Sequence, residues 1–302
     1  KYDKETLDSF ELGVKTTLMN NRLRTNFAAF HQDYKNVQQF NKKKLDKLLK
    51  KCHAVIYLAS DSTPGSSAKK PLFELQNNIQ PAFKFIDQLQ KHPHIHLIYA
   101  SSGGAIYDTR HYLDHPITEN HLMSPPSYYG AGKVAIEAFL MAYSHQFNHP
   151  VTILRPSNFY GVGQPHKPSF GLIRTIFDRL MNNQPIEIWG DGENKRDYLY
   201  IDDLVSIVCW FIEQSPKHQV YNVCSGTAEE HIAIAKMISD LTHQKSNVVL
   251  NNRKIVKHYS GSNELLLKEL EFQFTPMKQA LASLYSWYDN NKNTIDIDQF
   301  HF

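Results

Sequence analysis

Glycine and cysteine are both scarce in this sequence. Glycine supplies 13 of the 302 residues, about 4% where soluble proteins average about 7%. A fold that depends on a glycine-rich loop must therefore show where that loop lies. The three cysteines are odd in number, far apart and form no C-x-x-C pair: Cys52, Cys209 and Cys224. This pattern predicts reduced thiols in a cytoplasmic protein.

Long hydrophobic runs and an excess of one charge are also missing. The longest apolar run extends from Leu204 to Ile212 and contains one serine, far short of the roughly 20 residues that span a bilayer. Lysine and arginine exceed aspartate and glutamate by 33 − 30 = 3, which is too balanced for a dedicated nucleic-acid binder. The sequence therefore predicts neither a membrane nor a nucleic-acid partner.

The order of the predicted elements indicates the fold class. Short β-branched or aromatic runs predict strands at 14–19, 26–31, 54–59, 95–101 and 151–154. Helical spacing lies between and after them, around residue 45 and at 72–89, 128–147, 171–181, 202–213, 228–241 and 276–290. Such alternation predicts an α/β protein with a doubly wound parallel sheet covered by helices on both faces. We expect one domain at 1–160 and a smaller α/β lobe at 161–302, where the loops become more polar.

Tyr129 and Lys133 are the most promising residues for chemistry. They are four residues apart at the start of a predicted helix, so that both side chains lie on one face. A free phenol has a pKa of about 10, and a neighbouring ammonium group favours its ionised form. The pair could therefore move a hydroxyl proton. The same spacing also occurs as a surface pair on many helices, so its context decides.

The context is a strand that ends in small hydroxyl residues. Residues 96–102 read as a strand that runs into Ser101, Ser102, Gly103 and Gly104. In a doubly wound sheet, ligands bind at the carboxyl ends of the strands. Hydroxyl groups at this position could hydrogen-bond a substrate oxygen.

Several ordered segments resemble one family. These are residues 55–59, Asn78, residues 98–102, the Tyr129/Lys133 pair, residues 154–161, residues 188–203 and residues 221–226. Together they resemble the extended short-chain dehydrogenase/reductases, in particular the NAD-dependent epimerase/dehydratase group that acts on nucleotide sugars. The resemblance covers residues 12–287, and the segment 188–203 is its most specific part.

The resemblance implies roles for residues of this sequence. It implies a Rossmann-like dinucleotide-binding domain followed by a substrate lobe, with NAD as cofactor and a nucleotide-diphosphate sugar as substrate. Tyr129 would take the hydroxyl proton, with Ser102 assisting, and Lys133 would hold the nicotinamide ribose. The other implied cofactor contacts are Asn20, Asp33, Leu58, Ala59, Asn78, Ala100, Ser101 and Pro156. The implied substrate contacts are Ser102, Gly103, Asn158, Arg196 and Arg253, the two arginines pairing with the diphosphate.

The sequence departs from the family at its start. The family opens with a strand and a G-x-x-G-x-x-G turn that cradles the cofactor pyrophosphate, and no such motif occurs here. Residues 1–12 resemble the end of the following helix, and residues 13–19 resemble the second strand. We expect the natural reading frame to extend upstream by about 20–30 residues. The alternative is that the second and fourth strands close the gap, with weakened cofactor binding.

Two further departures concern the site itself. The family's catalytic serine or threonine corresponds to Gly103, one position after Ser102, so Tyr129 would receive less hydroxyl help. Residues 103–105 also lack the Asp-Glu pair of family dehydratases and the glutamate of related decarboxylases, which disfavours both reactions. At the end of the second strand, Asn20 replaces an acidic residue. The neighbouring Arg22 and Arg24 would suit NADP, or are solvated loop residues.

One further cluster could suggest a metal. His92, His94 and His96 are close in sequence, but no carboxylate or cysteine cluster accompanies them, and we predict no metal site.

The leading hypothesis is an NAD-dependent epimerase that acts at C4 of a UDP-hexose through a transient keto-sugar. A reductase of a nucleotide-linked keto-sugar is the second hypothesis, and a degenerate nucleotide-sugar-binding protein without catalysis is the third. The family also suggests a homodimer formed through two helices.

Overall fold

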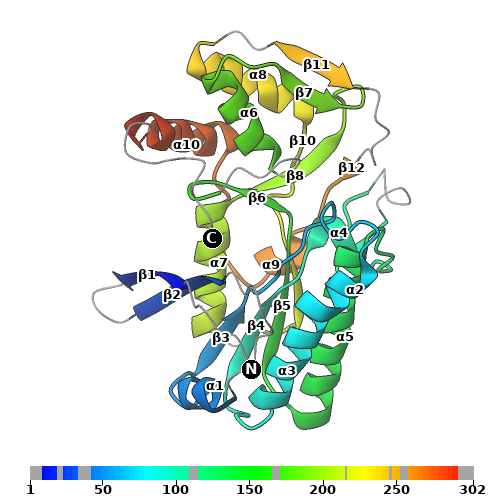
Figure 1. Ribbon diagram of the computed structural model, residues 1–302, viewed down its shortest axis with the longest axis vertical. Coiled ribbons are helices and arrows are strands. Elements are labelled where there is room, and N and C mark those ends of the chain that lie inside the picture. Colours follow the sequence, from blue (N-terminus) through cyan, green and yellow to red (C-terminus); the bar gives the residue numbers. More distant parts are fainter. Residues whose placement is uncertain are drawn as a thin grey trace, which may run out of the picture.

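The computed structural model describes residues 9–18, 23–32, 42–108, 115–164, 171–214, 216–244, 247–251 and 258–291. Two lobes lie one above the other in Figure 1. The lower lobe contains a parallel sheet flanked by long helices, and the upper lobe contains shorter strands and three helices. The predicted α/β class with a parallel, helix-covered sheet is confirmed.

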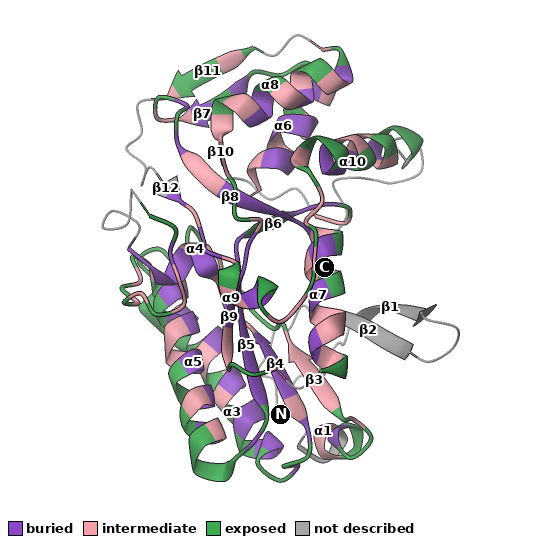
Figure 2. Cartoon of the chain, turned by 180° about the vertical axis from the view of Figure 1, so that it is seen from behind, coloured by how far each residue is buried: buried purple, intermediate pink, exposed green. Residues whose placement is uncertain are grey.

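The sheet of the lower lobe consists of four parallel strands. Its order is β3-β4-β5-β9, formed by β3 (Ala54–Tyr57), β4 (His96–Ala100), β5 (Val151–Pro156) and β9 (Val220–Val223). The central strands are buried on both faces because consecutive side chains point to opposite sides. On one face Leu97 and Ile153 pack under α1 (Lys42–Leu49), α3 (Gln80–Leu89) and α5 (Tyr128–Phe147). On the other face Ile98 and Leu154 pack against α7 (Ile201–Glu213) and α9 (Glu264–Leu267). Figure 2 shows most of β4 and β5 in the colour of buried residues.

The helix predicted at 72–89 contains a wider turn. It consists of α2 (Pro71–Glu74), the π-helical turn η1 (Leu75–Ile79) and α3. Pro81 has no amide hydrogen to continue an α-helical ladder, and the π turn accommodates this defect. The turn holds Asn78 in a buried position. A regular α-helical repeat does not predict this orientation.

The upper lobe is built on two small sheets. The strand β8 (Lys195–Tyr200) pairs with β6 (Asn158–Tyr160), β10 (Ala228–Glu230) and β12 (His258–Tyr259). A parallel pair is formed by β7 (Ile186–Trp189) and β11 (Val248–Asn251). The helices α6 (Leu172–Met181), α8 (His231–Thr242) and α10 (Met277–Asn291) enclose the largest apolar core. The helix predicted at 228–241 was therefore wrong in its first three residues, which pair with β8 as β10.

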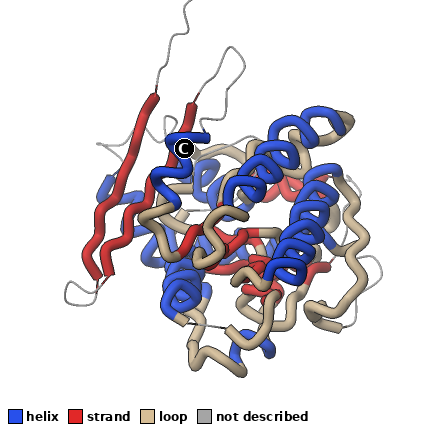
Figure 3. The backbone as a smooth tube through the Cα atoms, turned by 90° about the horizontal axis from the view of Figure 1, so that it is seen from below, coloured by secondary structure: helices blue, strands red, loops and turns tan. Residues whose placement is uncertain are grey.

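The N-terminal strands differ from the prediction. The strand β1 (Ser9–Leu18) pairs antiparallel with β2 (Leu23–Gln32), and this hairpin forms a sheet of its own at the margin of the molecule (Figures 1 and 3). Residues 9–12 are therefore strand and not the end of a helix, and residues 13–18 do not join the parallel sheet. Only four residues connect the two strands, which suits a hairpin because parallel strands need a crossover of a dozen or more residues.

The chain passes between the lobes more than once. After β8 in the upper lobe, α7 and β9 return to the lower sheet, where β9 pairs with β5. A boundary at residue 160 remains a proposal. Within the described residues, no helix is both long and apolar enough to cross a membrane.

Candidate active site

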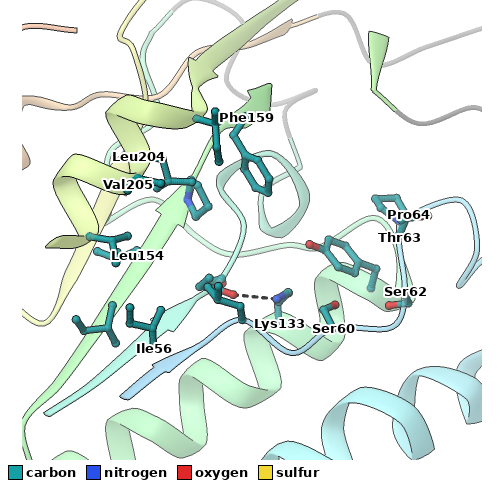
Figure 4. Close-up of a pocket in the computed structure, with 18 residues that line it drawn as sticks. Ile56, Ser60, Ser62, Thr63, Pro64, Lys133, Leu154, Phe159, Leu204 and Val205 are labelled. Atoms are coloured by element: carbon teal, nitrogen blue, oxygen red, sulfur yellow. Dashed lines mark hydrogen bonds between the residues drawn. The ribbon is translucent and has the colours of Figure 1, made fainter. Parts of the chain in front are cut away.

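A cavity of about 390 Å³ lies at the carboxyl ends of the lower strands. Its walls are the ends of β3, β4 and β5, the loop after β3 and one face of α7, as Figure 4 shows. Most of the lining is apolar: Ile56, Leu58, Pro64, Ile98, Ala100, Leu154, Pro156, Phe159, Ile201, Leu204, Val205 and Val208. The polar lining residues are Ser60, Ser62, Thr63, Ser101, Tyr129 and Lys133. A cavity of this size with few polar groups is typical of a small-molecule site.

Tyr129 and Lys133 lie in the first two turns of α5, which begins where the sequence predicts. The side chain of Ser127, the N-cap residue, accepts a hydrogen bond of 3.1 Å from the Gly130 amide. Only glycine fits at position 130, because a Cβ atom there would overlap the carbonyl oxygen of Ala105. This close contact packs the start of α5 against α4 (Gly103–Ile106), so the sequence around Tyr129 fixes the position of the phenol.

Lys133 is buried, and its ammonium group points into the cavity. Its Nζ donates a hydrogen bond of 2.9 Å to the carbonyl oxygen of Ala100 (Figure 4). The same atom lies 5.2 Å from the ring centroid of Tyr99 and 5.7 Å from that of Tyr129. Burial lowers the pKa of Lys133 to about 8, while Glu74 and Glu137 oppose that shift. The lysine therefore changes charge close to neutral pH.

The Tyr129 hydroxyl is paired with Ser102. Burial raises the pKa of Tyr129 above its ordinary value, whereas the hydrogen bond to the Ser102 side chain acts in the opposite direction. The sequence predicted that Lys133 would lower this pKa. That prediction was wrong, because burial outweighs every other contribution and the lysine is not among the causes of the shift.

The position of Gly103 explains why Ser102 has this role. A side chain at residue 103 would not face Tyr129, because its Cβ atom would overlap the hydroxyl of Tyr259 and lie 3.1 Å from the Arg155 carbonyl oxygen. Gly103 is therefore turned to the interior, and the preceding serine contacts the phenol. Ser102 is the hydroxyl residue that acts on Tyr129 in this structure, and the predicted shortage of hydroxyl help stays a prediction.

The other implied cofactor residues fall into three groups. Leu58, Ala100, Ser101 and Pro156 line the cavity, and Ala59 is an exposed neighbour of this lining. Asn78 does not line it but is buried behind the loop after β3, where its Oδ1 accepts a hydrogen bond of 2.7 Å from the Asp61 amide. Asn20, Asp33 and the substrate residue Arg253 lie outside the described residues.

Two implied substrate residues lie on the side of the upper lobe. Asn158, at the start of β6, donates a hydrogen bond of 3.0 Å to the carbonyl oxygen of Asp197. Arg196 lies on β8 opposite Tyr259 of β12. Burial lowers the pKa of Arg196. The two strands that carry them, β6 and β8, pair with each other, and neither residue is among those that line the cavity.

Glu74 is a residue that the sequence reasoning missed. Its buried carboxylate accepts hydrogen bonds from the Ser62 hydroxyl at 2.5 Å and from the Asn78 amide at 3.0 Å. A Cβ atom on Gly132 would overlap this carboxylate. The group thus joins the cavity loop to α5 beside Lys133. The available signal was the spacing of Glu74 and Asn78, four residues apart on one helix face.

A buried ion pair was missed as well. Arg155, on β5, binds Glu137, on α5, through Nε at 3.1 Å and through a second nitrogen at 2.6 Å. Arg155 also donates to the Tyr107 hydroxyl at 2.7 Å. Glu137 follows Lys133 by four residues, so the pair anchors the helix face that carries the lysine.

Two of the three clustered histidines contact side chains outside the cluster, and the ring of His94 lies edge-on to that of His92, with 6.3 Å between the centroids. His92 contacts Asp46 at 2.9 Å and His96 contacts Thr152 at 2.8 Å. In the described part of the chain, no three histidine, cysteine, aspartate or glutamate side chains are grouped as metal ligands.

The pKa of Lys133 predicts a pH-dependent stability difference. Because the folded pKa is about 8 against 10.5 for the free side chain, the unfolded chain binds more protons between these values. The free energy of unfolding should therefore rise with pH across that window. Near pH 7 the free energy of unfolding of Lys133→Met should exceed that of the wild type by roughly 3 kcal/mol, because the variant removes the cost of burying the ammonium group. The excess should shrink as the pH approaches 10.5.

Urea titrations at several pH values measure this difference. Lys84→Met, at an exposed position on α3, is the matched control for the loss of a lysine side chain. A pH-independent difference for Lys133→Met would contradict the assignment of the shift to its burial.

Comparisons with known proteins agree with the predicted family. The profile of the NAD dependent epimerase/dehydratase family matches residues 11–224, so the chain belongs to this family. A protein of Methanocaldococcus jannaschii with the provisional name UDP-glucose 4-epimerase is 30% identical over 251 residues, 81% of this chain and 80% of the relative. The dTDP-4-dehydro-6-deoxyglucose reductase of Escherichia coli is 30% identical over 234 residues, 76% and 68% of the two chains.

Solved structures show the same fold. The UDP-glucose 4-epimerase of Thermotoga maritima, crystallised with UDP-glucose, superposes with a TM-score of 0.76 at 22% identity. The superposition covers 83% of this chain and 82% of the other.

Proposed function

We propose that the protein is an NAD-dependent nucleotide-sugar epimerase that acts at C4 of a UDP-hexose. The observation that carries the proposal is the Ser102–Tyr129 hydroxyl pair beside the Lys133 ammonium, at the wall of an apolar cavity at the strand ends. Relatives named as UDP-glucose 4-epimerases support the nucleotide and the reaction.

The residues of the cavity suit the nicotinamide-ribose half of NAD. An ammonium group has three donors, and one of them is used by Ala100, so Lys133 can also bind ribose hydroxyls. The buried Ser101 hydroxyl has no hydrogen-bond partner within the described part of the chain. The apolar walls from Ile56, Leu154 and Pro156 suit a flat ring. When bound, NAD would accept a hydride from the substrate and return it.

The chain's own residues would handle the proton. The ionised form of Tyr129, which burial makes scarce near neutral pH, takes the proton of the C4 hydroxyl while the C4 hydrogen leaves as hydride, and a ketone remains at C4. The Ser102 hydroxyl donates a hydrogen bond to the phenolate oxygen of Tyr129. Tyr129 then returns the proton when the hydride adds to the opposite face of the ketone, so no net oxidation occurs. Asn158 and Arg196 would hold the diphosphate side of the substrate.

The short segment 103–105 argues against water elimination. It contains two glycines and an alanine, and an elimination needs an acid and a base at the sugar. The reductase of Escherichia coli keeps a second candidate open: a reductase would consume one reduced cofactor per product, whereas an epimerase regenerates its cofactor.

The test is incubation of the purified full-length protein with UDP-glucose and NAD, followed by NMR of the sugar. The expected result is conversion to the C4 epimer without accumulation of NADH. Product formation only with added NADH or NADPH and a keto-sugar would favour the reductase. Binding of UDP-glucose without any turnover, measured by calorimetry, would favour the binding protein.

A homodimer through α3 and α5 is also proposed. Exposed apolar side chains lie on α5 and on the α2 and η1 turns that precede α3: Ala131, Ala138, Phe139 and Ala142 on α5, Leu72 on α2 and Leu75 on η1. Phe139 is 54% exposed and stacks on Phe83 of α3, with 4.0 Å between the ring centroids. The small alanines would let a second copy's helices approach closely.

Phe139→Asp is therefore expected to weaken dimerisation roughly thirtyfold or more, as for a central interface residue. Sedimentation equilibrium measures the dissociation constant. Ile232→Asp, at an exposed apolar position on α8, should leave it unchanged. A monomeric wild type at micromolar concentration would overturn the proposal.

A further inference from the structure

Tyr259 fills the space beside Gly103. It lies on β12 and is packed with Ile106, Tyr107 and Ile117 in a small buried cluster. Its hydroxyl is enclosed by two glycines, since a Cβ atom on Gly103 would overlap it and one on Gly261 would lie 3.2 Å away. Within the described residues this hydroxyl has no hydrogen-bond partner.

An unpaired buried hydroxyl needs an explanation. Leaving such a group without a partner is unfavourable, and phenylalanine would avoid the penalty in an apolar cluster. The extra oxygen atom does one thing that a phenylalanine cannot do. It occupies the volume that a side chain at residue 103 would enter, and so it leaves no room for such a side chain at the N-terminus of α4.

The residue before Gly103 gains from this arrangement. Ser102 is the N-cap residue of α4 and has an extended backbone, with φ −157° and ψ 115°. The change from an extended to a helical conformation occurs between Ser102 and Gly103. With Gly103 held against Tyr259 and the Arg155 carbonyl, the Ser102 side chain is the one that contacts Tyr129.

We propose that Tyr259 is a positioning residue, which acts by filling the space beside Gly103 and thereby holds the Ser102 hydroxyl on Tyr129. The consequence of this positioning for catalysis rests on the proposed function, whereas the packing of Tyr259 against Gly103 does not depend on it. Tyr259 comes from the C-terminal part of the chain, so the upper lobe would determine which serine serves the site at the end of β4.

The geometry suggests a compensating pair of substitutions. With Tyr259→Phe, the nearest atoms to a new methyl group at residue 103 become the ring carbon that carried the hydroxyl and the Arg155 carbonyl oxygen, both at 3.1 Å. Both distances are shorter than ordinary van der Waals contact, so the phenyl ring at position 259 would have to shift slightly, but the severe overlap with the hydroxyl oxygen is gone. The methyl group of Gly103→Ala could then occupy the volume that the hydroxyl leaves, so the double variant should resemble the wild type more than either single variant does.

The experiment compares the wild type, Gly103→Ala, Tyr259→Phe and the double variant in two measurements. Thermal unfolding reports the packing. The second readout is a ¹⁹F NMR titration of 3-fluorotyrosine placed at position 129, without substrate or cofactor, and with Ser102→Ala as reference. The groups that face this phenol are Ser102 of α4, Glu74 of α2, Lys133 of α5 and Tyr99 of β4, and none of them changes within the cycle.

The inference predicts a specific pattern. Gly103→Ala should lower the melting temperature by several degrees through overpacking. It should also move the titration midpoint upward, in the direction of Ser102→Ala, because a lost hydrogen bond to the phenolate raises the pKa. Tyr259→Phe should move the midpoint in the same direction by less, and the double variant should restore most of both losses.

Two results would overturn the inference. One is a Gly103→Ala protein that melts and titrates like the wild type, and the other is a double variant no better than Gly103→Ala. Epimerisation is assayed separately on the wild type. A cycle that behaves as expected without any epimerisation would reject the proposed function and leave the positioning role intact.

Discussion

Tyr129→Phe should lower kcat for sugar epimerisation by about 10²–10⁴-fold, the range for loss of a general acid–base group. The phenyl ring keeps the packing of α5 but cannot take or return the hydroxyl proton. Lys133 and the cavity walls stay in place, so the affinity for NAD should change little. Single-turnover kinetics and calorimetry measure the two effects separately.

The neighbouring tyrosine offers a matched control. Tyr128 is 44% exposed on the first turn of the same helix, and Tyr128→Phe should leave kcat within a factor of about two, as expected for a surface change away from the site. If Tyr129→Phe retains full activity, the phenol is not the group that moves the proton, and the proposed mechanism fails.

Arg155→Met should lower the free energy of unfolding by about 3–5 kcal/mol, because it leaves the Glu137 carboxylate buried without its partner. Glu137 is fully buried and contacts the guanidinium through both oxygens. The expected loss is a large part of the roughly 5–15 kcal/mol that keeps a domain folded. Urea denaturation at pH 7 measures it.

Removal of both charges supplies the control for this prediction. Arg155→Met with Glu137→Leu should recover most of the lost stability, since a buried ion pair replaced by apolar groups is often neutral. A single variant as stable as the wild type would mean that solvent reaches Glu137, contrary to the burial in the structure.

Local patterns in the sequence predicted the elements of the lower lobe well. The helix at 128–147 has the predicted bounds because Ser127 caps it and its apolar spacing continues to Phe147. Residues 13–18 were misassigned because a strand's own sequence does not tell which neighbour it pairs with. Residues 228–230 were misassigned because pairing with β8 decides their conformation, and such pairing is not visible in a local window.

The site was predicted in part for a similar reason. Tyr129, Lys133 and Ser101 come from continuous motifs, and the structure brings them to one cavity. Ser102 takes the place of the serine or threonine that the family has at position 103. This arrangement depends on Tyr259, which is more than 150 residues away in the chain. The buried place of Asn78 depends on a π turn that no regular repeat predicts.

The path of the chain through both lobes has a consequence for dissecting the protein. The buried Asp197 of β8 accepts hydrogen bonds from the Ser157 hydroxyl and from the Ser225 and Gly226 amides, just beyond the ends of β5 and β9. A fragment that stopped near residue 160 would lack β9 and would leave β5 as an unprotected edge, open to aggregation. Neither half should therefore survive as a soluble product of limited proteolysis, and a variant of this chain would have to keep both lobes together in order to fold.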